Sequence, residues 1–310
     1  MTEQINLRKN FGEYLEKLGA KHKNILVIDT DLKNGLYTLF FGKSYPERHF
    51  TLGLNEAIAP GVAAGMTVRK KIPILCSEAA PLLGKALDQL KNAVCYPNLN
   101  LKIVISGSGL TSIEDGFPNT MSEDLAILQA LPNLKILSPI DQNELRVMLD
   151  FMMTDYGPTI IRIPKICTDS FFDHNYQFKL GEPIKIRPGD QISIVSYGEN
   201  LCEVIKTSNE LEKRGISAQV IHLPTLAPLN HESLENLCIN TELIVTVESH
   251  VQTGGLANLI QTVFQNKAKK FLPIYLNSLP ESSKYQDAIN RSNLSSKAIY
   301  ESIREKWISL

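Results

Sequence analysis

Short apolar runs alternate with helical patterns along this chain, and the alternation breaks only once. The runs in the first part are rich in Val and Ile, which is typical of strands buried in a parallel sheet. We expect such strands at 25–29, 72–75, 101–106, 134–138 and 159–163. We expect helices between them at 7–18, 56–68, 82–94, 123–131 and 142–153. This alternation predicts a mainly parallel sheet with helices on both faces.

The pattern lapses between Cys167 and Pro188, where polar and aromatic residues mix with Gly and Pro and predict a linker. A second alternation follows. Its strands are expected at 192–197, 218–222 and 243–248, and its helices at 200–214, 233–240 and 255–264. At 310 residues the chain is long enough for two separate cores. We therefore predict an α/β fold of two three-layer domains, 1–178 and 179–310.

Composition excludes several classes of function. A formal net charge of -1 gives no electrostatic basis for binding nucleic acid or an anionic membrane. No apolar run reaches transmembrane length, and the first ten residues lack the apolar core of a secretion signal. The five cysteines are scattered without a Cys-x-x-Cys spacing, so neither a zinc site nor a disulfide framework is indicated. A reducing cytoplasm fits this pattern.

Glu56 is the one acid in the otherwise apolar or small run from Phe50 to Gly65. A carboxylate surrounded by Leu, Ile, Val and Ala loses water, which disfavours its charged form and suits it to share a proton with a ring nitrogen. The alternative is an exposed acid in the first turn of a helix, where the helix dipole favours negative charge. The local residues alone favour this alternative.

Two further segments offer possible ligand sites. Gly107-Ser108-Gly109 has the composition of a phosphate-binding loop, but its position after a strand favours a tight turn. Glu248 and His250 form either a charged site or the hydrogen-bonded start of a helix, and such patterns favour the helix start. No cluster of oxygen ligands for Mg²⁺ or Ca²⁺ is evident, so we predict no metal site in this chain.

A set of short motifs occurs in one order from about Phe11 to about Phe264. It comprises Ile25-Leu-Val-Ile-Asp29-Thr-Asp31-Leu32, Tyr45-Pro-Glu-Arg48, Leu52-Gly-Leu-Asn-Glu56, Gly61-Val-Ala-Ala-Gly65, Asp88-Gln-Leu-Lys-Asn92, Tyr96-Pro-Asn-Leu-Asn100, Gly109-Leu-Thr, Glu114-Asp-Gly116 and Ala130-Leu-Pro-Asn133. The ordered set resembles the C-terminal section of transketolase, a thiamine-diphosphate enzyme. It is most similar to the smaller subunit of split, two-gene transketolases.

The resemblance implies a pyrimidine-binding domain followed by a transketolase C-terminal domain, whose family role is mainly dimerisation. Glu56 matches the family glutamate that bonds the pyrimidine ring of the cofactor and promotes loss of the thiazolium C2 proton. Asp31 matches an acid near the cofactor, and its alternative is a helix N-cap. The family holds the diphosphate through Mg²⁺ or Ca²⁺ with a Gly-Asp-Gly segment, which this chain lacks. A partner subunit is therefore expected to hold the diphosphate and the metal, in an α2β2 heterotetramer.

The resemblance also suggests substrate contacts. Asp115 matches a family aspartate that bonds a sugar hydroxyl, and its alternative is a turn residue before Gly116. Arg162 matches an arginine that binds the phosphate of a sugar phosphate, because its guanidinium donors suit an anion at the C-terminal end of a strand. The alternative for Arg162 is a surface ion pair.

Departures from the family pattern gather on the cofactor and acceptor contacts. One family histidine is Asn119 here, which forms hydrogen bonds but carries no proton at neutral pH. A second histidine is Gly107, and a phosphate-contacting serine is Gly35. The aromatic pair that stacks on the pyrimidine is replaced by Glu78 and Pro81, which become the candidate cofactor contacts at that place.

Three functions agree with these residues. The first is a transketolase-like enzyme that transfers a two-carbon ketol unit from a ketose to an aldehyde or aldose, with altered substrate specificity. The second is the β-type subunit of another thiamine-diphosphate enzyme, a 2-oxoacid dehydrogenase or a relative of deoxyxylulose-phosphate synthase. The third is a non-catalytic subunit that stabilises a partner. The retained Glu56 and Asp115 favour the first.

Overall fold

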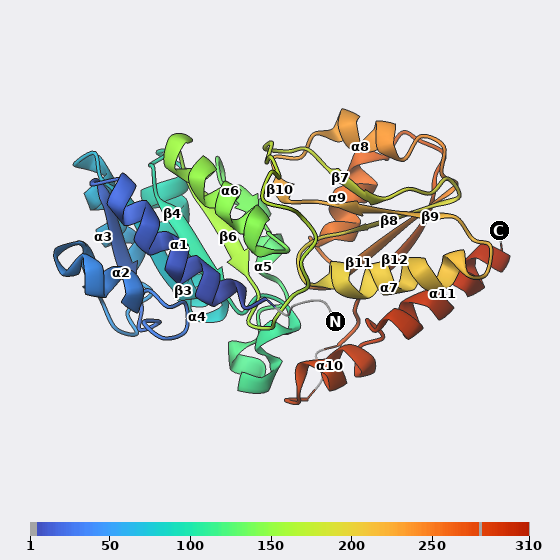
Figure 1. The fold of residues 1–310 in the computed structure, drawn as a ribbon, viewed down its shortest axis with the longest axis horizontal. Helices are drawn as coiled ribbons and strands as arrows, with labels where there is room; N and C mark the ends of the chain where they lie inside the picture. The colour runs from blue at the N-terminus through green and yellow to red at the C-terminus, as the bar shows by residue number, and fades with distance from the viewer. Residues whose placement is uncertain (1–4, 279–280, 310) are drawn as a thin grey trace. The chain divides into compact units, whose positions relative to one another are not determined.

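The computed structural model describes residues 5–278 and 281–309 of the chain, which form two compact α/β units (Figure 1). One unit comprises the chain up to Ser108 together with Ile127–Phe178. The other comprises Gly109–Ala126 together with the chain from Lys179 onward. The predicted α/β fold with two sheets is confirmed. The predicted domain limits, 1–178 and 179–310, stay a prediction, and the packing assigns the segment 109–126 to the second unit.

The sheet of the first unit has the order β5-β6-β4-β3-β1-β2, and every pairing among these strands is parallel. The strands are β1 (Ile25–Asp29), β2 (His49–Thr51), β3 (Ile72–Glu78), β4 (Lys102–Ser106), β5 (Lys135–Leu137) and β6 (Thr159–Ile163). All residues of β4 and β6 are buried, as expected for central strands covered on both faces. Because the strands are parallel, their C-terminal ends meet at one edge of the sheet.

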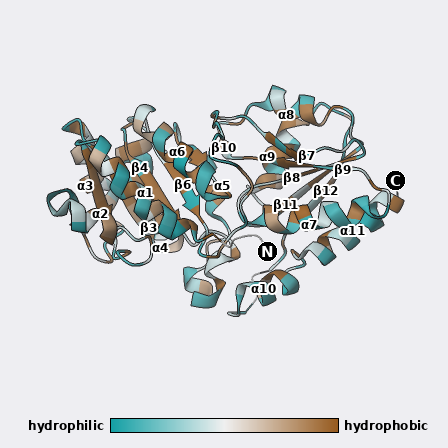
Figure 2. Ribbon diagram, in the orientation of Figure 1, coloured by the Kyte–Doolittle hydropathy of each residue, from teal (hydrophilic) through white to brown (hydrophobic). Residues whose placement is uncertain are grey.

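The helices of the first unit connect these strands. They are α1 (Leu7–Lys21), α2 (Leu39–Ser44), α3 (Ala59–Val68), α4 (Ala79–Gln89) and α6 (Gln142–Thr154), with a π-helical turn at Leu90–Cys95. Helices α1 and α6 pack side by side, and α3 and α4 pack on β3 (Figure 1). Figure 2 shows predominantly hydrophobic strands between helices whose ribbons carry both hydrophilic and hydrophobic residues. This apolar layer between helices is the core.

The sheet of the second unit has the order β12-β11-β8-β9-β7 and is parallel except for the antiparallel edge strand β7. Its strands are β7 (Ile184–Arg187), β8 (Ile192–Ser196), β9 (Ala218–His222), β11 (Leu243–Val251) and β12 (Lys270–Leu276), and β10 (Thr225–Ala227) follows β9. Its helices are α7 (Asn200–Glu212), α8 (His231–Leu237), α9 (Leu256–Val263), α10 (Tyr285–Arg291) and α11 (Ser296–Ile308). No helix in the described residues is long and apolar enough to span a membrane.

The prediction of a linker between Cys167 and Pro188 is partly wrong. Residues 184–187 form the edge strand β7, whose Ile-Lys-Ile-Arg alternation was too short to stand out beside Pro188. The rest of the region is held to α6 by Asp141, which caps that helix through Oδ1. The Asp141 Oδ2 atom accepts the backbone N–H groups of Phe171 and Phe172. Residues 167–178 are therefore an ordered part of the first unit, and the chain from Lys179 belongs to the second unit.

The segment 109–126 contains two 3₁₀ turns, Leu110–Asp115 and Phe117–Asn119, and the start of α5 (Asp124–Gln129). Gly107 and Gly109 both have positive φ, at 83° and 58°, a conformation that favours glycine, and the tight turn at this place stays a prediction. The backbone N–H of Gly109 donates to the Met121 carbonyl at 2.7 Å, which closes the segment into a loop.

Candidate active site

Glu56 lies in the turn between β2 and α3 and is 2% exposed. Its Oε2 atom accepts a hydrogen bond from the Lys85 ammonium at 3.0 Å, and the Lys85 side chain is 54% exposed. Among the described residues, none donates to Oε1. The alternative of an exposed acid on the helix is therefore wrong. The site combines a buried carboxylate, one cation that reaches it from α4, and one carboxylate oxygen without a protein donor.

Asp31 follows the C-terminal end of β1 and is exposed. Its φ is +72°, a left-handed conformation that Asp adopts more readily than most residues. The next helix begins only at Leu39, so the N-cap alternative for Asp31 is wrong. As a result the Asp31 side chain stands on a turn beside the C-terminal edge of the sheet.

Asp29, at the end of the same strand, is fully buried, and the sequence did not single it out as a site residue. Its Oδ1 accepts the Leu32 backbone N–H, and its Oδ2 accepts the Thr38 hydroxyl. Burial raises the pKa of Asp29, while these two hydrogen bonds act in the opposite direction. Asp29 therefore fixes the shape of the turn that presents Asp31.

Glu78 is the last residue of β3 and directly precedes α4. Its Oε2 lies 2.9 Å from the Lys165 ammonium, and both side chains are about one-fifth exposed, at 22% and 18%. Pro81 is half-buried in the first turn of α4, where its missing N–H leaves no intrahelical bond unmade. An ion pair and a proline ring thus stand where the family motif has aromatic rings.

Arg162 lies near the C-terminal end of β6 and is 4% exposed. The guanidinium Nη1 lies 3.5 Å from the hydroxyl of Ser138, which follows β5. A side chain this buried does not form a surface ion pair, so that alternative is wrong. The guanidinium lies at the sheet edge that also carries the ends of β1 and β3.

Asp115 and Asn119 lie in the two 3₁₀ turns of the second unit, and both are exposed. The Asn119 side-chain amide donates to the Asp115 backbone carbonyl at 2.9 Å. Gly116 separates the turns with a φ of +85°, as the turn alternative for this motif expects. This hydrogen bond from the Asn119 side chain therefore fixes the backbone around the Asp115 carboxylate.

The structure divides the predicted site residues between the two units. Glu56, Asp31, Glu78, Pro81 and Arg162 all follow or end strands at the C-terminal edge of the first sheet, where parallel α/β sheets bind ligands. Asp115 and Asn119 belong to the second unit.

Two lysines were missed from the sequence, Lys85 and Lys165, each the partner of a predicted acid. Each lysine lies far along the chain from its acid, so no local spacing connects the two partners. A signal for Lys85 was present, because it is the one charged residue between Glu78 and Asp88 on the first turns of α4.

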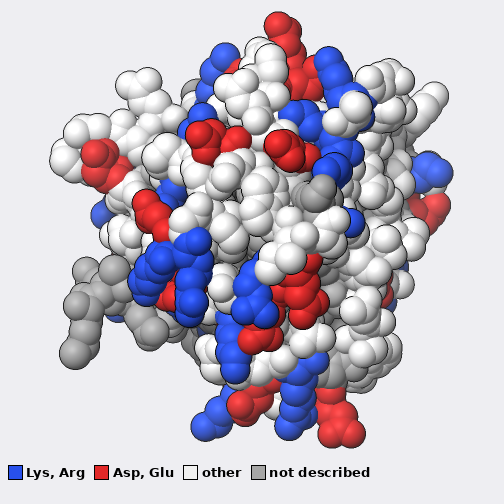
Figure 3. All heavy atoms as spheres, turned by 90° about the vertical axis from the view of Figure 1, so that its right-hand side faces the viewer, with Lys and Arg blue, Asp and Glu red and all other residues white. Residues whose placement is uncertain are grey.

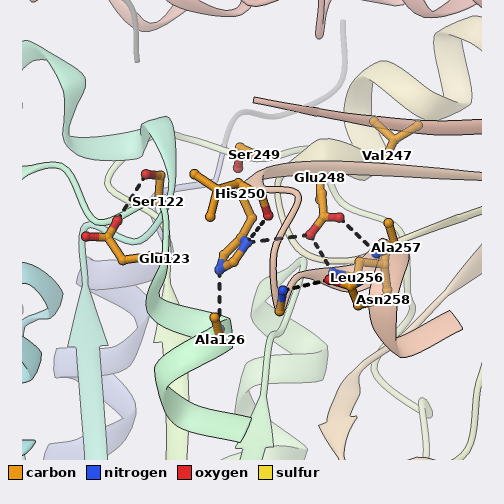
Figure 4. A network of polar contacts seen from close by, with 12 residues as sticks. Ser122, Glu123, Ala126, Val247, Glu248, Ser249, His250, Leu256, Ala257 and Asn258 are labelled. Carbon is orange, nitrogen blue, oxygen red and sulfur yellow. Dashed lines mark hydrogen bonds and ion pairs between the residues drawn. The ribbon is translucent and has the colours of Figure 1, made fainter. Parts of the chain in front are cut away.

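Glu248 and His250 point to the same side of the end of β11, because side chains two residues apart share one face of a strand. Glu248 is fully buried, and its carboxylate accepts the N–H groups of Leu256 at 2.5 Å and Ala257 at 2.9 Å (Figure 4). These are free donors at the start of α9. The predicted hydrogen-bonded helix start is therefore confirmed.

Charges on the face shown in Figure 3 are mixed, with acidic and basic groups interspersed. Neither sign forms a continuous field on that face. In the residues that the structure describes, no group of three or more His, Cys, Asp or Glu side chains is arranged to hold a metal ion.

Comparison with family models gives two matches that together span most of the chain. Transketolase, pyrimidine binding domain, matches residues 3–169. Transketolase, C-terminal domain, matches residues 181–299.

Individual relatives are similar over nearly the whole length. A putative transketolase C-terminal section from Methanocaldococcus jannaschii is 31% identical over 305 residues, 97% of this chain and 96% of that protein. The 6-deoxy-6-sulfo-D-fructose transketolase subunit SqwH of Clostridium sp. is 30% identical over 259 residues, 83% of this chain and 80% of that protein. A solved structure described as a split gene transketolase, inactive beta4 tetramer, has a TM-score of 0.89 and 28% identity, and the match covers 97% of this chain and 98% of that one.

Proposed function

The chain belongs to the transketolase family, as the C-terminal section of a split transketolase, and we propose that it is one half of a thiamine-diphosphate-dependent enzyme. The complete enzyme transfers a two-carbon ketol unit from a ketose donor to an aldehyde or aldose acceptor. The N-terminal partner subunit supplies the diphosphate-binding half and the Mg²⁺ or Ca²⁺ ion. Two subunits of each kind form the α2β2 heterotetramer. Five free cysteines support a reducing compartment, the cytoplasm.

The observation that carries this proposal is the buried Glu56 carboxylate with one oxygen paired to Lys85 and the other without a donor in the described chain. A carboxylate oxygen to which no protein group donates can accept a hydrogen bond from a donor that a ligand brings. The aminopyrimidine ring of thiamine diphosphate brings such a donor when its ring nitrogen is protonated. The residues at Glu56 therefore fit this end of the cofactor.

Glu56 holds and exchanges a proton at the ring nitrogen, and Lys85 compensates its negative charge when the proton leaves. When bound, the cofactor supplies a nucleophilic carbon that adds to the carbonyl of the donor sugar. Asp31 lines the cofactor site beside β1. A positioned acid–base group of this kind contributes roughly a hundred- to ten-thousand-fold to rate.

We propose three residues as substrate contacts. Asp115 accepts a hydrogen bond from a sugar hydroxyl, and Asn119 donates or accepts beside it. Arg162 binds an anionic group of the substrate through its guanidinium, since burial strengthens an electrostatic contact. Exposure of Asp115 and Asn119 supports their access to a ligand.

Glu78 and Pro81 contact the pyrimidine in place of aromatic rings. The Glu78–Lys165 ion pair offers charge and hydrogen bonds rather than a stacking face, and Asn119 replaces a proton-carrying histidine. We infer that these changes alter the accepted sugar or aldehyde rather than abolish the reaction, because Glu56 and Asp115 are both present. The named relative from Clostridium sp., whose substrate is a sulfonated sugar, supports a family in which acceptors and donors vary.

The test is reconstitution. The purified chain alone is expected to give no thiamine-diphosphate-dependent turnover, and addition of a partner that carries Gly-Asp-Gly and a downstream Asn is expected to give it. Ketol transfer is measured with hydroxypyruvate as donor and a series of aldoses and aldose phosphates as acceptors. Turnover by the chain alone would refute the two-subunit enzyme, and a complex that binds the cofactor without any transfer would support a non-catalytic role.

A further inference from the structure

The end of strand β11 makes an unusual set of contacts within the second unit. Glu248 caps α9, which follows β11 in the chain. His250 contacts α5, which precedes β11 in the chain (Figure 4). The His250 Nδ1–H donates to the carbonyl of Val251 at 2.5 Å. Its Nε2 accepts the backbone N–H of Ala126 at 3.3 Å. One strand end therefore caps two helices through alternate side chains.

The contact with Ala126 satisfies one of the free N–H groups in the first turn of α5. The two bonds of His250 are compatible only with the neutral ring that carries its proton on Nδ1, because Nε2 must offer a lone pair. The ring is fully buried and lies 3.9 Å from the Glu248 carboxylate. The orientation of the ring is therefore set by Ala126, Val251 and Glu248.

Backbone contacts join the same two segments. The Val251 N–H donates to the Ser122 carbonyl at 2.9 Å. A Cβ on Gly254 would lie 2.5 Å from the Ala126 Cβ, so only glycine permits this approach. At the other end of the loop, a Cβ on Gly109 would lie 2.5 Å from the Ser249 hydroxyl. The loop 109–126 is thus fitted against β11 at both of its ends.

The middle of the loop is held from another element of the second unit. The Ser282 hydroxyl donates to the Glu114 carbonyl at 3.2 Å. The backbone N–H of Tyr285, at the start of α10, donates to the Glu114 carboxylate at 3.3 Å. Asp115 is the next residue. The C-terminal unit therefore sets the position of the turn that carries Asp115 and Asn119.

We propose that His250 is a positioning residue for substrate binding, which holds the loop 109–126 through the Ala126 N–H and so places Asp115 and Asn119. This proposal rests on the substrate roles assigned above to Asp115 and Asn119. It gives the C-terminal domain a part in recognising the substrate. No contact of His250 with cofactor or substrate is required.

Amide hydrogen exchange tests the positioning itself without any substrate. The His250→Asn variant keeps a donor for the Val251 carbonyl but is too short to accept from Ala126. Loss of one helix cap is expected to lower protection of the 109–126 peptides about fivefold, while peptides from β8 and β9 keep theirs. His250→Gln carries an acceptor at the Nε2 position and is expected to restore most of the protection. The matched control is His231→Asn, because His231 is exposed on α8 in the same unit.

Unchanged protection of 109–126 in His250→Asn would overturn the proposal, as would equal losses in the Asn and Gln variants. Should His250→Asn not fold, the same comparison is made between His250→Gln and the native chain. In that comparison, protection of the loop within a factor of two of the native value supports the proposal. If His250→Gln lowers the protection of the 109–126 loop as much as that of the rest of the second unit, the proposal is overturned.

Kinetics of the assembled two-subunit enzyme test the link to substrate. With hydroxypyruvate as donor and D-ribose 5-phosphate as acceptor, His250→Asn is expected to raise the acceptor KM about fivefold. Exchange of the cofactor C2 hydrogen is expected to keep its native rate, because Glu56 is untouched. An unchanged KM in His250→Asn, when Asp115→Ala raises it, overturns the proposal. An unchanged KM in both variants overturns the substrate role of Asp115 and the positioning role with it.

Discussion

Glu56 and Glu248 are both buried glutamates, Glu56 in the turn before α3 and Glu248 near the end of β11, but their carboxylates have different surroundings. Glu248 is saturated by protein donors, since both of its oxygens accept backbone N–H groups at the start of α9. Glu56 has one oxygen paired to a lysine that is itself 54% exposed, and its other oxygen has no donor among the described residues. One carboxylate is committed to the fold, and the other is available to a ligand.

This difference separates a structural acid from a catalytic one better than burial does. The charge of Glu248 is stabilised by fixed dipoles, so removing the charge costs stability. The charge of Glu56 is stabilised by a side chain that water also reaches, so its removal costs little stability but removes a proton-exchanging group. Variants of Glu56, Glu248 and Lys85 test this separation, and a variant of Lys102 tests a third buried charge.

Glu56→Gln is expected to lower turnover of the assembled enzyme by roughly a hundred- to ten-thousand-fold, because an amide keeps the shape of the side chain but exchanges no proton. Glu248→Gln is the matched control and is expected to lower turnover less than about tenfold in enzyme that remains folded. Steady-state ketol transfer measures both. Equal losses in the two variants would remove the distinction between them.

Glu248→Ala is expected to lower the free energy of unfolding by about 3 kcal/mol, since two buried N–H groups of α9 lose a charged acceptor. Urea unfolding followed by far-UV circular dichroism measures this change. Glu56→Ala serves as the comparison and is expected to cost less than half as much. A larger loss for Glu56→Ala would show that Glu56 is the structural acid of the two.

Lys102 is a third buried charge, and it gives the first unit a pH dependence. Its ammonium donates to the carbonyls of Asp155 and Gly157 at 2.9 and 2.7 Å, and burial lowers its pKa from 10.5 to about 7. The unfolded chain therefore binds more protons than the folded chain between pH 7 and 10.5. Stability is expected to rise with pH across this window, by up to roughly 5 kcal/mol.

The comparison for that prediction is Lys102→Met, which removes the titrating group and is expected to flatten the rise between pH 7 and 10.5. Urea unfolding midpoints at several pH values measure the difference between the native chain and the variant. A rise of the same size in Lys102→Met would assign the pH dependence to other groups.

The Glu56–Lys85 ion pair is expected to contribute little to the free energy of unfolding. A double-mutant cycle with Glu56→Gln and Lys85→Met should give a coupling energy below about 1 kcal/mol, because the Lys85 ammonium is half-exposed. Unfolding free energies of the four proteins measure the coupling. A coupling of about 3 kcal/mol or more would mean that the pair holds the fold, as Glu248 does.

Much of the fold was predictable because buried parallel strands read as continuous apolar runs. The limits predicted for β1, β6 and β9 match the structure to the residue. Four strands were missed: β2, β7, the short strand β10, and the edge strand β12, whose apolar run is interrupted by Pro273. β2 has only three residues, two of them exposed, and β7 alternates over four residues beside Pro188, so neither has a continuous apolar run. Short strands at a sheet edge take their conformation from a neighbour rather than from their own sequence.

The candidate site was only partly predictable, for a related reason. Glu56 stood out because a lone acid in an apolar run is a local feature of the sequence. Its partner Lys85 lies 29 residues further along the chain, and Ala126 lies 124 residues from His250. Contacts over such distances depend on how the elements pack. The packing of the loop 109–126 with the second unit had no local signal at all.

The most direct test of the account is exchange of the cofactor C2 hydrogen, followed by NMR in deuterated buffer with the assembled two-subunit enzyme and no substrate. This measurement isolates the proton transfer assigned to Glu56 from every later step. Glu56→Gln is expected to slow the exchange at least about a hundredfold, while Glu248→Gln is expected to leave it near the native rate. Native exchange in Glu56→Gln, with cofactor bound and the complex intact, would contradict the account.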